Sequence, residues 1–142
     1  MGPIRPSGPF GKEQRIRKRA EFQDIQGNGR RVFTRNFVLM LAARELSEEH
    51  STARLGITVS RRAGNSVARN RAKRLIREAF RATRELWAPD LDVVVIARGP
   101  LGSLGLGDVV GEFRGAKQPI QRRTQEARQD HKTRKDRLAE TR

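Results

Sequence analysis

Residues with the potential for chemistry concentrate in one stretch, residues 66–81, which reads SVARNRAKRLIREAFR. Its only acid is Glu78, and its cations are Arg69, Arg71, Lys73, Arg74, Arg77 and Arg81. At 100° per residue, apolar side chains from Val67 to Trp87 fall on one arc, whereas most of the cations and Asn70 fall on the opposite arc. Arg71 projects to the border between the two. Like charges one turn apart repel each other, so local stability does not explain this pattern. It predicts an amphipathic helix with a polyanion-binding outer face.

An ordinary solvated helix face is the alternative, but such a face normally mixes Glu with Lys or Arg. Most of the cations are arginines, whose planar guanidinium groups fit phosphate oxygens and stack on bases. Arg61 and Arg62 precede the helix, and free N–H groups at a helix N-terminus attract phosphate. Asn70 could read a base or 2′-hydroxyl edge, or it could simply be an exposed polar residue. DNA could accept such a helix in its major groove, but no helix-turn-helix pair, zinc finger or zipper accompanies it. RNA is therefore slightly favoured.

Catalytic and metal-binding patterns are missing from the sequence. There is no cysteine, and the two histidines, His50 and His131, lie far apart in polar segments. No GxSxG, HExxH or P-loop pattern occurs. The glycines of GSLGLG at 102–107 have the wrong spacing for a dinucleotide fingerprint. We therefore expect no catalytic residue and no metal ligand in the protein itself.

The overall charge supports a polyanionic partner. The 142 residues include 31 Lys and Arg against 16 Asp and Glu, which gives a formal net charge of +15. An anionic membrane surface is a second candidate partner. However, no apolar run approaches the ~20 residues of a membrane span, and no signal peptide is recognisable at the start. A ribosomal protein or a general RNA chaperone also remains open. We expect no membrane contact, and the lack of cysteine is compatible with the cytoplasm.

The elements that must position the basic helix follow from hydrophobic periodicity. We expect a first helix over about 12–26, strands over 31–34, 36–43, 53–60 and 92–97, the basic helix over 66–87, and a weak helix over 108–118. Strand 53–60 alternates between an apolar face and a small, polar face that another element could cover. The order indicates one α+β sandwich with a mostly antiparallel sheet. Residues 1–11 read as a flexible arm, 12–117 as the domain, and 118–142 as a basic, flexible extension outside the core.

Residues 54–80, RLGITVSRRAGNSVARNRAKRLIREAF, resemble the signature strand, turn and RNR helix of the bacterial ribonuclease P protein family. RIRKRAEFQDI (15–25), RNFVLM (35–40) and DVVVIARGP (92–100) match in the same order. The resemblance implies an α-β-β-β-α-β-α sandwich on a four-stranded sheet, similar to domain 2 of ribosomal protein S5. It also implies a left-handed β-α-β crossover, which is rare.

The family resemblance also implies the function. Members bind a large catalytic RNA, and the ribonucleoprotein hydrolyses precursor tRNA to release its 5′ leader. This endoribonuclease carries its catalysis on the RNA, which holds most of the Mg²⁺, so we expect no cofactor on the protein alone. The resemblance thus implies that this chain binds the catalytic RNA and the leader of precursor tRNA.

Carried over by position, the RNA-binding residues are Arg61, Arg62, Arg69, Asn70, Arg71, Lys73, Arg74, Arg77 and Arg81. A leader cleft between the first helix and the sheet corresponds to Phe22, Phe37 and Met40. Two positions depart from the family pattern, since Gln26 stands where many members carry Phe and Met40 where some carry Tyr. For Phe22 and Phe37, plain core packing is the open alternative.

Overall fold

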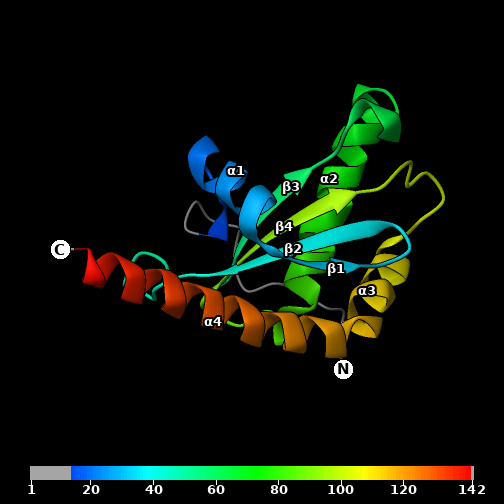
Figure 1. The fold of residues 1–142 in the computed structure, drawn as a ribbon. Coiled ribbons are helices and arrows are strands. Elements are labelled where there is room, and N and C mark those ends of the chain that lie inside the picture. The colour runs from blue at the N-terminus through cyan, green and yellow to red at the C-terminus, as the bar shows by residue number, and fades with distance from the viewer. Residues whose placement is uncertain (1–13, 142) are drawn as a thin grey trace.

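The computed structural model describes residues 14–141, so the expected arm over 1–11 lies outside the described residues. Within this range, eight main elements follow one another: α1 (Arg19–Asn28), β1 (Arg30–Phe33), β2 (Phe37–Ala43), β3 (Arg54–Thr58), α2 (Ser66–Ala82), β4 (Leu91–Ala97), α3 (Leu106–Gly115) and α4 (Lys117–Glu140) (Figure 1). Short 3₁₀ turns lie at Arg61–Ala63 and Arg84–Leu86. The first helix begins later than expected, because Arg15 instead forms a bridge beside Leu55 of β3.

The sheet has the strand order β1-β2-β4-β3. The β1–β2 and β2–β4 pairs are antiparallel, whereas β3 and β4 are parallel and are connected through α2. The predicted α+β sandwich with a four-stranded, mostly antiparallel sheet is therefore confirmed. The left hand of the β3-α2-β4 crossover stays a prediction.

One face of the sheet forms the main core with α2 and α3. Phe37 of β2 meets Phe113 of α3 edge-on at a centroid distance of 5.4 Å. Trp87 stacks on Phe80 at 5.0 Å. The predicted inner arc of α2 is largely confirmed, since it buries Ala72, Leu75, Ile76, Ala79 and Phe80.

The ends of α2 differ in part from expectation. Asn65 caps its start, because the Asn65 side chain accepts a 2.9 Å hydrogen bond from the Ala68 amide. Val67, predicted to face the sheet, is 77 % exposed. It lies in the first turn of α2, which extends past the sheet (Figure 1). The helix ends at Ala82 rather than near Trp87, and Thr83 starts a tighter 3₁₀ turn there.

Helix α1 covers part of the opposite face of the sheet, as the small, polar face of β3 suggested. Ile25 of α1 packs with Ile16, Met40 and Val94 in a second, smaller core. The Phe22 ring lies directly on Gly56 of β3, where an added Cβ would come within 2.5 Å of a ring carbon. Glycine at position 56 is therefore what allows α1 to approach the sheet so closely.

The expected flexible extension over 118–142 is wrong for most of its length. Residues 117–140 form α4, which packs along β1 and β2 and buries Ile120, Thr124 and Ala127. Ion pairs hold it to distant parts of the chain: Arg30 contacts Asp130 at 2.8 Å, and Arg128 contacts Asp90 at 2.9 Å. Its apolar residues are sparse because charged contacts provide much of the attachment.

Candidate RNA interface

The outer face of α2 is strongly cationic. Arg74, Asn70, Arg61 and Arg62 are exposed, whereas Arg69, Lys73, Arg77 and Arg81 are half-buried. Across residues 14–141, no ion pair joins Arg69, Lys73, Arg74 or Arg77 to a carboxylate. The Nε atom of Arg69 is buried without a hydrogen-bond partner. On α4, in contrast, Arg123, Arg128, Arg134 and Lys135 all contact carboxylates.

Arg77 shows that the cationic surface continues beyond α2. Partial burial lowers the pKa of Arg77, and the positive charges of Arg15 and Arg74 lower it further. Arg15 belongs to the segment before α1, which is fixed beside β3 by the 3.1 Å hydrogen bond from the Ile16 amide to the Leu55 carbonyl. Two segments far apart in the sequence thus bring like charges together. A bound polyanion relieves that repulsion.

Arg61 and Arg62 lie where the sequence placed them, at the start of α2. The Ser60 side chain accepts a 3.3 Å hydrogen bond from the Arg62 amide and so begins the 3₁₀ turn. Gly64 has a φ of 125°, a conformation that favours glycine, and the chain reverses there into the Asn65 cap. Both arginines therefore lie in the turn just before the N-terminus of α2, a position that favours phosphate.

Arg71 makes hydrogen bonds within the fold, and its RNA contact stays a prediction. Its Nη2 atom donates a 2.7 Å hydrogen bond to the Leu104 carbonyl, and its Nη1 atom lies 3.5 Å from the Leu101 carbonyl. Arg71 thus ties α2 to the glycine-rich loop before α3. Its projection to the border of the helix face was the sequence signal for this position.

The predicted cleft residues do not all share one side of the sheet. Met40 is buried beneath α1, and Phe22 is half-buried beside it. Phe37 is fully buried on the opposite face, so its assignment to the cleft is wrong. Successive side chains of a strand alternate between faces. Phe37 and Met40 are three positions apart, so they had to point to opposite sides.

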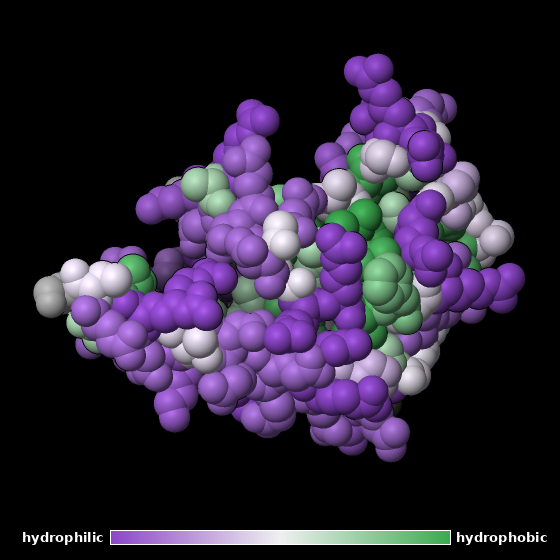
Figure 2. Space-filling model, viewed as in Figure 1, coloured by the Kyte–Doolittle hydropathy of each residue, from purple (hydrophilic) through white to green (hydrophobic). Residues whose placement is uncertain are grey.

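Phe33, Val38 and Ile96 lie on the same face of the sheet as Met40, and sequence reasoning did not single them out. The strand register pairs Phe33 with Val38 and Val38 with Ile96. This row crosses the face that α1 covers only in part, and Phe33 is 63 % exposed. Thr58 completes the row on β3, where its hydroxyl accepts a 3.1 Å hydrogen bond from the side-chain amide of Gln26 on α1. Figure 2 shows hydrophobic atoms gathered over this end of the sheet, in a hollow between α1 and the start of α2.

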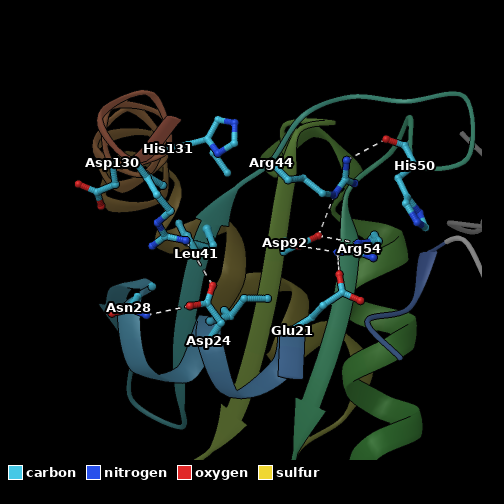
Figure 3. A pocket seen from close by; sticks show the side chains of 16 residues that line it. Glu21, Asp24, Asn28, Leu41, Arg44, His50, Arg54, Asp92, Asp130 and His131 are labelled. Atoms are coloured by element: carbon cyan, nitrogen blue, oxygen red, sulfur yellow. Dashed lines mark hydrogen bonds and ion pairs between the residues drawn. The ribbon is translucent and has the colours of Figure 1, made fainter. Parts of the chain in front are cut away.

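A polar cavity of about 370 Å³ lies between α1, the sheet and α4 (Figure 3). Asp92 accepts from Arg54 at 2.7 and 2.8 Å and from Arg44 at 2.9 Å. Glu21 of α1 also accepts from Arg54, at 2.7 Å. Arg44 further donates to the His50 carbonyl at 2.8 Å and so anchors the loop that follows β2. These groups neutralise one another and brace the fold.

A search of residues 14–141 finds no cluster of three or more His, Cys, Asp or Glu side chains arranged to hold a metal ion. Within the same residues, no helix combines the length and apolar character that crossing a bilayer requires. The fold and the site together define the class of protein: an α+β domain that presents one polycationic helix face beside a partly open sheet.

Comparison with known proteins defines the family within that class. The family model described as Ribonuclease P matches residues 10–134. A ribonuclease P protein component from Syntrophus aciditrophicus is 40 % identical over 102 residues, which cover 72 % of this chain and 82 % of the relative. Another, from Shouchella clausii, is 44 % identical over 98 residues, covering 69 % and 78 %. The chain belongs to the ribonuclease P protein family, and it is a protein subunit of that endoribonuclease.

Solved structures agree with this assignment. The RNase P protein of Staphylococcus aureus aligns with a TM-score of 0.59 at 36 % identity, covering 72 % of this chain and 90 % of that one. The RNase P protein from Thermotoga maritima aligns with a TM-score of 0.62 at 28 % identity, covering 71 % and 92 %.

Proposed function

We propose that this protein binds the catalytic RNA of ribonuclease P through the outer face of α2 and holds the 5′ leader of precursor tRNA over the open sheet face. The observation that carries the proposal is that no carboxylate within residues 14–141 forms an ion pair with the α2 cations Arg69, Lys73, Arg74 and Arg77. RNA phosphates would supply the missing partners, and each contact would release counterions. The proposed compartment is the cytoplasm, where catalytic RNA and precursor tRNA meet.

Leader binding is supported by the surface beside α2. Single-stranded RNA is recognised by splayed bases that stack on aromatic or apolar side chains while cations follow the backbone. The row of Phe33, Val38 and Ile96 provides the apolar surface. Exposed Arg61 and Arg62 lie at the start of α2, on the far side of the hollow that Figure 2 shows.

Mg²⁺ enters this proposal as an ion held mainly by RNA. Two carboxylates in the polar cavity, Asp92 and Glu21, are already bound by arginine, so they make poor ligands for a divalent cation. When bound to the RNA, Mg²⁺ activates water and stabilises the leaving oxygen. The contribution of this chain is to neutralise RNA charge and to position the precursor.

Reconstitution tests the proposal. Precursor tRNA is incubated at low Mg²⁺ with the protein alone, with the cognate catalytic RNA alone, and with both. We expect no cleavage by the protein alone and strong stimulation of the RNA by the protein. Cleavage without RNA, or no stimulation at any Mg²⁺ concentration, would refute the proposal. Mature tRNA without a leader serves as the binding control, and the complete enzyme should bind it more weakly than the precursor.

A further inference from the structure

Phe33 is an aromatic side chain that the fold leaves in solvent. It ends the edge strand β1 and is 63 % exposed. Every other aromatic side chain within residues 14–141 is buried or half-buried. An exposed phenylalanine forgoes the stabilisation that its burial would give. The ring is therefore available for contact with a binding partner.

The backbone that carries Phe33 is held firmly. The turn after it is fixed by Glu112 of α3, whose carboxylate accepts 2.8 and 2.7 Å hydrogen bonds from the Asn36 amide and side chain. Glu112 also accepts from the Thr34 hydroxyl, and Arg98 donates to the Thr34 carbonyl at 2.7 Å. These contacts join β1, the turn, β4 and α3. A ring on so fixed a backbone loses little freedom when a flat partner binds it.

The surroundings of Phe33 suit RNA. Phe33 shares its sheet face with Arg31, two residues earlier on β1, and exposed Arg35 and Arg98 flank the turn. Its cross-strand neighbour Val38 is half-buried and continues the apolar row toward Ile96. An aromatic ring beside an apolar strip and several arginines is the combination that single-stranded nucleic acid favours. A protein partner would find several charges to desolvate here.

We propose that Phe33 is a base-stacking platform for the 5′ leader, at the β1 edge of the cleft. The inference rests on the proposed function and adds a specific residue to it. Gln26 cannot stack as an aromatic ring does, and its amide is already bound to Thr58. The exposed ring of Phe33 therefore offers a leader base a stacking surface on the face of the sheet that α1 partly covers, at the β1 edge.

The test is a mutant cycle in the reconstituted enzyme. Precursor tRNAs with one abasic nucleotide at successive leader positions are bound to enzyme carrying wild-type protein, Phe33→Leu or Phe33→Trp. With an intact leader, Phe33→Leu should weaken binding about 5- to 100-fold, and Phe33→Trp should preserve it. At one leader position, the abasic substitution should remove the difference between wild type and Phe33→Leu. Affinity for leaderless tRNA should not change.

One control variant and the wild-type preference for the leader separate the possible outcomes. Leu46→Ala removes another exposed apolar side chain, 55 % exposed in the loop after β2, and should not change binding. Suppose that the wild-type enzyme binds precursor tRNA more tightly than leaderless tRNA, but that Phe33→Leu binds every abasic precursor and the intact precursor as wild type does. The stacking role is then refuted, while the proposed function stands. If wild type itself shows no preference for the leader, the proposed function fails first. A change in sedimentation of the free Phe33→Leu protein with unchanged RNA binding would mark a protein contact and refute the proposal.

Discussion

Arg71 of α2 donates a 2.7 Å hydrogen bond to the backbone carbonyl of Leu104, 33 residues further along the chain. The contact joins the basic helix to the loop that leads into α3. One residue of the RNR motif therefore stabilises the fold by holding the loop before α3, while its neighbours on the outer face of α2 remain available to RNA.

Replacing Arg71 by alanine should loosen the loop. The Leu104 amide donates a 2.9 Å hydrogen bond to the Leu101 carbonyl, and Arg71 restrains both residues. Loss of a hydrogen bond to a charged group should speed hydrogen exchange of this amide roughly tenfold or more. Arg74→Ala, on the exposed face of the same helix, should leave the exchange rate unchanged. Equal rates in Arg71→Ala and wild type would contradict the tether.

Helix α4 should contribute to global stability. Ile120 is fully buried, and Ile120→Ala should lower the free energy of unfolding by about 2–5 kcal/mol. Leu138, 62 % exposed near the end of the same helix, provides the matched control. Leu138→Ala should change stability by no more than about 0.5 kcal/mol. Urea denaturation measures both, and two equally small effects would show that α4 lies outside the cooperative unit.

Acid should release α4 from the domain. Hydrogen bonds from Arg128 and Arg30 lower the pKa values of Asp90 and Asp130, respectively. A lowered carboxyl pKa gives stabilisation that is complete above the unfolded-state pKa, about 3.9, and is lost as pH falls through the folded-state value. At pH values below about 4, hydrogen-exchange protection factors along α4 should therefore decrease. The Asp130→Asn variant should show a smaller decrease. Protection that is independent of pH would argue against ionic attachment.

Among the carboxylates that pair with arginine, Asp92 should be the one whose replacement lowers the free energy of unfolding most. It bridges Arg54 and Arg44 in a buried position, so Asp92→Ala would leave two poorly solvated guanidinium groups without their partner. The expected loss in the free energy of unfolding is about 3–5 kcal/mol. Glu85→Ala breaks a solvent-exposed ion pair with Arg114 and should cost no more than about 1 kcal/mol. Denaturant titration distinguishes the two, and similar losses would mean that the buried network contributes little.

Periodicity was sufficient for the elements that bury a continuous apolar face. It predicted the strands and the inner arc of α2, because each depends on contacts with a regular local spacing. It failed for α4, whose attachment depends on pairs such as Arg30 with Asp130, 100 residues apart. No local pattern encodes such a pair.

The candidate site was predicted unevenly for a similar reason. The cationic arc of α2 is a property of one helix, so the sequence alone defined it. The cleft depends on which strand faces meet α1, and here the resemblance placed Phe37 on the wrong side although strand alternation separates it from Met40. Phe33 was missed because its exposure depends on which part of the sheet α1 leaves uncovered, and no local pattern encodes that.

The salt dependence of binding to the catalytic RNA tests the central claim most directly. The slope of log K against log salt concentration is compared for wild type, for Lys73→Gln with Arg74→Gln, and for Arg122→Gln with Lys132→Gln on the exposed side of α4. If α2 binds RNA, the Lys73→Gln and Arg74→Gln pair should reduce the magnitude of the slope by about one unit for each phosphate that the helix no longer neutralises. The α4 pair should leave the slope unchanged. Equal slopes for wild type and the α2 pair would contradict the claim that this helix face binds RNA.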